Sequence, residues 1–367
     1  MPKTSYFPAP KNDIILSRQI AFAAAFLLPA AKLLETPSIL ATYAKGDLLL
    51  PALLHFILQF AVLSALLFTI SQSEKTLFER LNERLGRWSL VFYGIYALYF
   101  LFAAVLPLLD MEKFTYAAFF DTSPTVFAFV AFFIFSAFVC AKGLKTLGRT
   151  ADLCLFLYLI PFLALIGMAL STADFSHLLP LFGGKFGDTM YAFKRTTPHF
   201  SDTVLLLPLL GNLRYKKGDS TKIIGGYAVG AVGTLLFLAT FFSIYSSISP
   251  REHYAFSKIA EYFPALDVIG RVDLLFVYML TIVLLFFTAM PLQYTTQLIC
   301  HTFQVKKSVL VSAILNIGAL VFLLFANRHY NAIYSLIGGK LSIVFWFIAD
   351  MLPLFFLFLP KKERKRA

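Results

Sequence analysis

The residues of this chain best suited to chemistry lie inside an apolar run near its start. Lys32 and Glu35 stand three positions apart, between Pro29 and Pro37. Each charge alone would cost ~3 kcal/mol near the centre of a bilayer, so neither is expected to face lipid. Each proline removes a helical donor and clashes with the preceding turn, so a helix here must kink or unwind. We predict that this break handles a substrate or a proton. In the alternative interpretation, the two charges neutralise each other and close a helix bundle.

A second break of the same kind is predicted at Pro198. The residue before a proline is disfavoured in a helix, and Ser201 or Asp202 could then cap a new half-helix. The positive end of such a half-helix attracts a substrate carboxylate. Asp202 would either contact the ligand or act only as a cap, in which case Asn should replace it without loss of function. His199 is either a hydrogen-bonded core residue or a proton relay.

Both breaks together form the predicted substrate site. Its residues are Pro29, Ala30, Ala31, Lys32, Glu35, His199, Phe200, Ser201 and Asp202. Lys194 and Arg195 would line an electropositive vestibule, or else their side chains reach to the membrane interface. Asp350, three residues before Pro353, and His55 are candidates for an ion or proton relay, with a packing network as the alternative for Asp350.

Other kinds of chemistry find no support in the sequence. The six histidines form no His-x-x-x-His or Glu-x-x-His pair, and there is no Gly-x-Ser-x-Gly elbow or phosphate loop. Cys140, Cys154 and Cys300 have no metal-ligand spacing and are an odd number for pairing, so three free thiols are expected. We therefore predict no catalytic residues, no metal and no cofactor, and we do not expect an enzyme.

The elements that must position the two breaks are membrane-spanning helices. Of the 367 residues, 59% are hydrophobic and 42 are Phe, and the mean hydropathy is +0.76. Such a chain has too little polar surface to coat a soluble globule, and its apolar windows exceed the ~18 residues that indicate a spanning helix. We predict ten spans, at residues 17–44, 48–71, 88–110, 124–141, 150–171, 189–213, 223–247, 266–292, 309–326 and 341–359.

The orientation of these spans follows from the distribution of Lys and Arg. Far more of them lie in the connections on the side of the N-terminus than on the opposite side, which predicts that both termini are cytoplasmic. The same basic loops, facing anionic lipid headgroups, account for the net charge of +12 without nucleic acid. Residues 1–16 form a polar cytoplasmic segment with no sign of a signal peptide, and residues 360–367 form a basic cytoplasmic tail that anchors the last helix.

The order of the spans predicts one polytopic domain, residues 1–367, built from two repeats. An offset of five helices matches the broken first span with the broken sixth, so residues 17–171 and 189–359 would be the two halves. An odd number of helices in each half inverts the second, which is the plan of many secondary transporters. The expected fold is therefore all-α, with ten transmembrane helices in a 5+5 inverted repeat and breaks in helices 1 and 6.

Short motifs, in order along nearly the whole chain, resemble those of the spore germination permease family, the B-type subunits of nutrient germinant receptors. A Thr-x-Pro-like turn precedes the fourth span, and a Gly-Leu-x-x-x-x-Arg segment leads into the fifth. The matching segments are Phe120-Asp121-Thr122-Ser123-Pro124, Gly143-Leu144 with Arg149, Leu27-Leu28-Pro29, Phe200-Ser201-Asp202 with Pro208, and Gly270-Arg271-Val272-Asp273. The first break departs from the family, because it is rich in Ala and contains Lys32, and the acid of the sixth span is Asp202 where Glu is usual.

The resemblance implies an amino acid/polyamine/organocation-type fold in the inner membrane of a spore. It also implies recognition of an amino acid or related nutrient, beside A-type and C-type receptor subunits, in germination signalling. A second function stays open, that of a stand-alone proton-coupled amino-acid transporter. A membrane-embedded enzyme or channel is the third class, and no catalytic constellation favours it.

Overall fold

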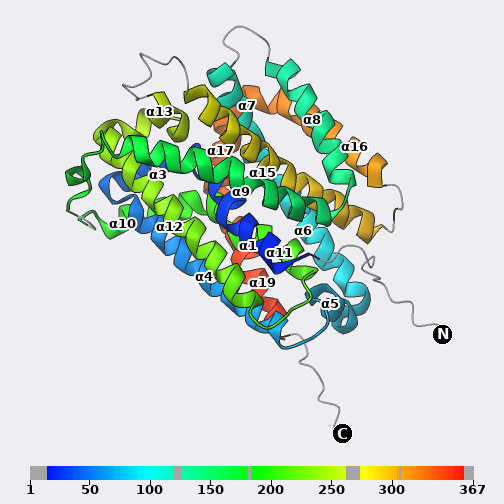
Figure 1. Cartoon of the computed structure of the whole chain (residues 1–367). Coiled ribbons are helices and arrows are strands. Elements are labelled where there is room, and N and C mark those ends of the chain that lie inside the picture. Colours follow the sequence, from blue (N-terminus) through cyan, green and yellow to red (C-terminus); the bar gives the residue numbers. More distant parts are fainter. Residues whose placement is uncertain are drawn as a thin grey trace, which may run out of the picture.

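The computed structural model describes residues 15–119, 125–180, 183–261, 273–303, 305 and 308–358. Every regular element named within these residues is a helix, and the helices pack into one bundle (Figure 1). Residues 1–14 of the predicted terminal segment 1–16, the tail 360–367 and the motif residues 120–124 and 270–272 lie outside the described residues.

Long apolar helices make up most of the bundle. In the part of the chain that the structure describes, six helical segments are long and apolar enough to cross a membrane, or seven if one bent pair counts as a single span. One of the six segments contains α6 and most of α7, and α8 is not among the six. The longer helices are α4 (Leu49–Ser71), α6 (Ser89–Ala103), α7 (Val105–Phe119), α8 (Thr125–Ala141), α9 (Leu144–Ala169), α12 (Asp219–Tyr245), α15 (Asp273–Thr302) and α16 (Ser308–Ala326).

Several predicted span ends were wrong because hydropathy omits charged or polar helical turns. Helix α9 begins at Leu144, directly after Gly143 with a φ of 86°, and includes the charged turn that the predicted start at 150 left out. Helix α7 continues past the predicted end at 110 to Phe119. Helix α15 runs through Pro291 to Thr302, so the predicted end at 292 was wrong there as well.

Helix α15 is the central element of the bundle. It packs against α6, α8, α9 and α16, and α8 and α16 also pack on each other (Figure 1). It is bonded directly to the second break, because the hydroxyl of Tyr294 donates to the carbonyl oxygen of Leu205 at 2.7 Å. Helix α15 therefore contacts the segment that follows the second break.

The first break divides one apolar segment into pieces that point in different directions. Helix α1 (Ser17–Phe22) passes through a π-helical turn (Ala23–Leu27) into α2 (Leu28–Ala31), and Lys32 is the C-cap of α2. Helix α3 (Thr36–Ala44) then leaves at 64° to the segment before it.

The second break separates α10 (Phe186–Thr196) from α11 (Asp202–Gly211). Between them lie a 3₁₀ turn (Thr197–Phe200), which carries Pro198, and Ser201, whose φ of −81° and ψ of 52° are not helical. Pro198 lacks the N–H that an α-helix would need at this point. The chain therefore starts a new helix at Asp202, in the interior of the protein.

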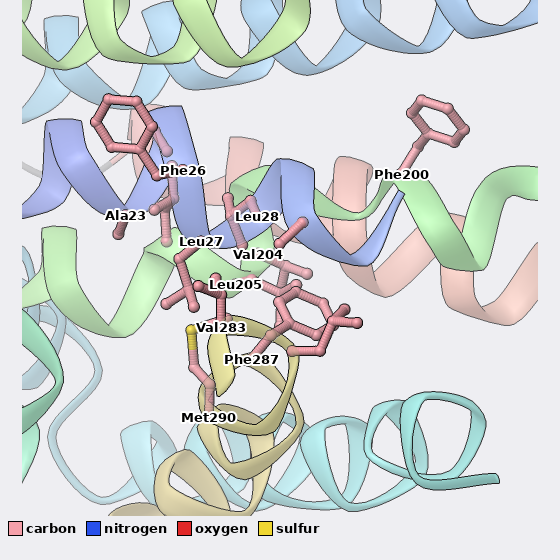
Figure 2. Close-up of a cluster of buried hydrophobic side chains, with 14 of the residues drawn as sticks. Ala23, Phe26, Leu27, Leu28, Phe200, Val204, Leu205, Val283, Phe287 and Met290 are labelled. Atoms are coloured by element: carbon pink, nitrogen blue, oxygen red, sulfur yellow. The ribbon is translucent and has the colours of Figure 1, made fainter. Parts of the chain in front are cut away.

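Apolar side chains hold both breaks against α15. Figure 2 shows one such cluster, in which side chains from the two breaks meet side chains of α15. Its members include Leu27, Leu28, Val204 and Leu205 from the breaks, and Val283 and Phe287 from α15. All six are buried, with exposed fractions of no more than 8%.

Helix α12 approaches the first break closely enough to require glycine. A Cβ atom on Gly230 would lie 2.5 Å from the carbonyl oxygen of Ala24, and one on Gly226 would clash in the same way with the carbonyl oxygen of Ala21. Real Cβ atoms do not approach backbone oxygen so closely, so these two glycines set the distance between α12 and the start of the first break. This contact brings Tyr227, which lies between them, to the break.

Short helices close the two ends of the bundle. Helix α13 (Ala255–Glu261) lies at the end where α7 is found, and α5 (Leu77–Leu85) lies at the opposite end (Figure 1). Helix α5 is capped by Thr76, which accepts from the N–H of Glu79 while Glu79 accepts from the N–H of Thr76.

The last predicted span, 341–359, is a chain of short helical pieces through Phe358. Before it come α17 (Tyr330–Ser335) and a π-helical turn (Leu336–Lys340). Its own pieces are α18 (Ser342–Trp346), a π-helical turn (Phe347–Met351), α19 (Leu352–Leu354) and a 3₁₀ turn (Phe355–Phe358).

Candidate functional site

The two breaks are joined by an ion pair in the interior of the protein. The Nζ atom of Lys32 lies 2.5 Å from Oδ1 of Asp202, and the two side chains are only 2% and 3% exposed. Tyr227 donates its hydroxyl to the other carboxylate oxygen of Asp202 at 3.2 Å. The Lys32 ammonium also lies 3.4 Å from the carbonyl oxygen of Leu28 and 5.4 Å from the ring centre of Phe200.

This pairing contradicts one of the two alternatives that the sequence left open for the two charges, and their handling of a substrate or a proton stays a prediction. Lys32 bonds to Asp202 and not to Glu35, so the predicted mutual neutralisation of Lys32 and Glu35 does not occur. Asp202 is also not the cap of α11, because the N-cap position is held by Ser201 and carries no side-chain cap hydrogen bond. Sequence spacing favoured the local partner, whereas the fold brings a residue 170 positions away within bonding distance.

A second set of contacts ties the first break to α13. The carbonyl oxygens of Leu33 and Leu34 accept from the backbone N–H groups of Phe256 and Ala255, each at 3.1 Å. These carbonyls lose their helical partners at the break, and the first turn of α13 supplies replacements. Beside them, Nδ1 of His253 lies 3.1 Å from a carboxylate oxygen of Glu35.

His253 lies in a loop outside the spanning segments, and its environment changes its titration. The hydrogen bond to Glu35 raises the pKa of His253 above its ordinary value, against an opposing effect of partial burial and of Lys113. The carboxylate of Glu252 acts in the same direction as Glu35. The contact between His253 and Glu35 is therefore strongest when the imidazole is protonated.

Gln59 connects the start of α11 to the π-helical turn Phe347–Met351. Sequence reasoning did not assign this role to Gln59. Its side-chain oxygen accepts from the backbone N–H of Thr203 at 2.9 Å, which satisfies a donor left open at the start of α11. Its amide nitrogen donates to Asp350 at 2.5 Å. Asp350 is thus part of a packing network, and its predicted role as a relay stays a prediction.

The two predicted intramembrane histidines are both held by hydrogen bonds. The ring of His55 is stacked between those of Phe193 and Phe200, with ring centres 4.0 and 4.5 Å apart. Its Nε2 lies 2.9 Å from the carbonyl oxygen of Phe193, so that nitrogen carries the proton and donates. Nε2 of His199 lies 3.0 Å from the hydroxyl of Tyr334.

A partly open cavity lies between the two breaks and helices α6, α7 and α15. From the breaks it is lined by Ala31, Leu34, Pro198, His199, Ser201 and Leu205. The other lining residues are Tyr99, Phe102, Ala103, Leu106, Pro107, Asp110, Met111, Leu284, Phe287, Thr288, Pro291, Ile337 and Phe345. The walls are mostly apolar, with a few polar groups that converge on the same space.

Asp110 supplies the only carboxyl group among the described lining residues of this cavity. Among the described lining residues, none is Glu, Lys or Arg, and Asp110 is the one Asp. Its side chain is buried and accepts from the hydroxyl of Tyr330 at 3.0 Å. Lys113 lies one turn away, with its ammonium 3.5 Å from the ring centre of Tyr330.

The predicted site residues fall into two groups. Ala31, His199 and Ser201 line the cavity. The remaining predicted residues, Pro29, Ala30, Lys32, Glu35, Phe200 and Asp202, are not among its lining residues. The ion pair of Lys32 and Asp202 is thus not part of the cavity wall.

The predicted vestibule residues lie elsewhere. Lys194 and Arg195 line a separate surface hollow, together with Tyr191 and residues of the segment 332–343. The guanidinium of Arg195 donates to the hydroxyl of Tyr191 at 2.7 Å and lies 5.8 Å from the ring centre of Tyr43. Neither residue lines the cavity between the breaks, so the predicted vestibule has no direct support.

Sequence reasoning missed Tyr99, Asp110 and Thr288, three polar residues of the cavity wall. One signal was available for Asp110, since it follows Pro107 by three positions within an apolar run, much as Asp350 precedes Pro353. Tyr99 and Thr288 are common residue types in apolar helices, and only the fold shows that they face the breaks. In the described residues, no group of three or more His, Cys, Asp or Glu side chains is placed to hold a metal ion.

Comparisons with known proteins agree with a transporter-type fold. The structure is similar to the manganese transporter of Eremococcus coleocola in complex with an aromatic bis-isothiourea substituted compound. The TM-score is 0.55 at 13% identity, over 92% of this chain and 78% of that one. A point mutant of the same transporter gives a TM-score of 0.54 at 13% identity, over 94% of this chain and 80% of that one. At this identity the likeness shows a shared fold.

Sequence comparison shows the family. No curated protein matches the chain. The family model described as spore germination protein matches residues 17–331, which is most of the chain. The chain is therefore a multi-pass membrane protein of the permease type, and it belongs to the spore germination protein family.

Proposed function

We propose that this protein is a permease-like subunit that binds an amino acid or a related nutrient between its two breaks and takes part in spore germination signalling. The observation that carries this proposal is the cavity whose wall includes residues from both breaks. Ligand sites are commonly concave, with mostly apolar walls and a few convergent polar groups. A ligand in this position would contact both breaks at once.

The polar groups of the wall suit the two ends of an amino acid. The carboxyl group of Asp110 can bond to a ligand ammonium. The hydroxyls of Ser201 and Thr288 donate to the carbonyl oxygens of Thr197 and Leu284, and they would release these bonds to donate to a ligand carboxylate when it binds. The ten-residue helix α11 starts next to Ser201, and its positive end adds to the attraction for a carboxylate. Apolar neighbours such as Phe102 and Phe287 would hold an apolar ligand side chain.

The membrane arrangement that accompanies this function is also proposed. It has ten spans in a 5+5 inverted repeat, with broken helices 1 and 6 and both termini in the cytoplasm, in the inner membrane of the spore. In this arrangement α13 lies at the outer end of the bundle and α5 at the inner end. The protein would act beside A-type and C-type receptor subunits, as the family resemblance implies.

Binding to the purified full-length protein tests the proposal. A panel of labelled amino acids should contain at least one that binds, and Asp110→Asn should weaken the binding of that ligand by at least tenfold because its ammonium loses a buried charge partner. Glu112→Gln is the matched control on the same helix, since Glu112 does not line the cavity. Binding that is equally strong in the Asp110→Asn variant would place the ligand elsewhere.

The transporter fold favours a second candidate function, that of a proton-coupled amino-acid transporter. Liposomes distinguish the two functions. A sensing subunit binds its nutrient without accumulating it, whereas a transporter accumulates it when a proton gradient is imposed and stops when the gradient is dissipated.

A further inference from the structure

The junction of the two breaks is built like a binding site for a cation. Around the Nζ atom of Lys32 lie a carboxylate oxygen of Asp202, the carbonyl oxygen of Leu28 and the face of the Phe200 ring. Carboxylate and carbonyl oxygens at a helix break, with an aromatic face beside them, are groups that attract an ammonium ion. The cation that occupies this site is the ammonium group of Lys32.

We propose that this junction is an alkylammonium-binding site that the protein fills with the side chain of its own Lys32. The covalently held ammonium joins α2 to α11, and it therefore replaces a mobile cation that would otherwise have to bind there. A tethered cation loses less freedom on binding than a free one, so the junction is always occupied.

The burial of Asp202 explains why the site needs a cation. Its side chain is 3% exposed, and its described partners are Lys32 and the hydroxyl of Tyr227. One neutral hydroxyl does not offset the cost of burying a carboxylate, which requires a charge partner as well as hydrogen bonds. Removal of the Lys32 side chain should therefore leave a cavity beside the Asp202 carboxylate, and this cavity should bind a small ammonium ion from solution.

Chemical rescue of a truncated lysine tests this inference. Lys32→Ala removes three methylenes and the ammonium, which together are the atoms of n-propylammonium. In the purified full-length variant, n-propylammonium should raise the melting temperature saturably, by on the order of 2 °C at concentrations well above its dissociation constant. The wild-type protein, whose site is full, should not respond.

Three controls separate this effect from general solvent effects. The neutral n-propanol, of nearly equal size, should not stabilise Lys32→Ala, and tetramethylammonium should be too wide for the narrow channel left by a lysine side chain. Lys32→Ala with Asp202→Asn should lose the response to n-propylammonium, because the anionic partner is gone. A folded Lys32→Ala variant that does not respond to n-propylammonium would overturn the proposal.

A second pair of variants covers the case in which Lys32→Ala does not fold. Lys32→Met leaves the Asp202 carboxylate buried without its cation, whereas Lys32→Met with Asp202→Asn removes both charges. We expect the double variant to yield more folded protein than Lys32→Met alone. Equal yields of folded protein for wild type, Lys32→Met and the double variant would contradict a site that requires a cation. These readouts are stability and yield, so they are independent of nutrient binding.

Discussion

Two buried charged residues of the first break, only three positions apart, have partners in opposite environments. Lys32 forms a pair with Asp202 in which both side chains are almost fully buried. Glu35 contacts His253, whose side chain is 61% exposed. Both partners come from the second half of the chain, so the same break is tied to that half twice, once inside the protein and once at its surface.

The difference between these two contacts is one of dielectric environment. A buried ion pair is little screened, and removing one partner leaves an uncompensated charge in a medium that solvates it poorly. An exposed contact is screened by salt and contributes little to the free energy of unfolding. The inner pair therefore behaves as a permanent link, whereas the outer contact can open with a small change in conditions.

Breaking the inner pair should have the largest effect. Asp202→Asn keeps the size of the side chain but leaves the Lys32 ammonium buried without its carboxylate, so we expect a loss of about 3–5 kcal/mol in the free energy of unfolding. Denaturant titration of the purified protein measures this loss. The same substitution at Asp152, whose partner Arg18 is 62% exposed, is the matched control and should cost less than about 1 kcal/mol. Equal effects at the two positions would remove the distinction between buried and exposed pairs.

A smaller effect is expected where α13 covers the first break. Ala255→Pro deletes the N–H that donates to the carbonyl of Leu34, and a buried acceptor without a donor costs about 1–3 kcal/mol. Ala255→Ser keeps this N–H and is the control. Hydrogen exchange at residues 255–261 should become faster in the proline variant alone. Unchanged exchange in that variant would mean that α13 is held by its side chains and not by this backbone contact.

The smallest effect should be the pH dependence of the outer contact. The pKa of His253 is raised in the folded protein by Glu35, so its stabilising contribution is fully present below the unfolded pKa and is lost as the pH rises through the folded pKa. Between about pH 6 and pH 8, stability should therefore fall by less than about 1 kcal/mol, because His253 is largely exposed. His253→Gln should flatten this part of the pH profile. A wild-type profile that rises over this range would contradict the assignment.

The sequence predicted where the chain breaks better than it predicted what each break contacts. Pro29, Pro37 and Pro198 act locally, through the missing N–H and the clash with the preceding turn, so their effect is visible in the sequence. The pairing of Lys32 with Asp202 depends on how distant segments pack. It could not be distinguished from a local pair of Lys32 with Glu35.

The cavity wall was less predictable for the same reason. Ala31, His199 and Ser201 were found because they lie near prolines, whereas Tyr99 and Thr288 lie in regular helices and face the breaks only through the packing of α6 and α15. Charged helical turns also hid the true ends of α7 and α9, since hydropathy marks the apolar part of a helix and not its last hydrogen bond.

The central claim, that the cavity between the breaks holds the nutrient, is tested most directly by filling that cavity. Ala103 lines it, whereas Leu98, on the same helix α6, is 59% exposed on the outside of the bundle. In equilibrium binding to the purified protein, Ala103→Phe should weaken the binding of the nutrient by at least tenfold, and Leu98→Phe should leave it unchanged. Wild-type affinity in a folded Ala103→Phe variant would contradict the account.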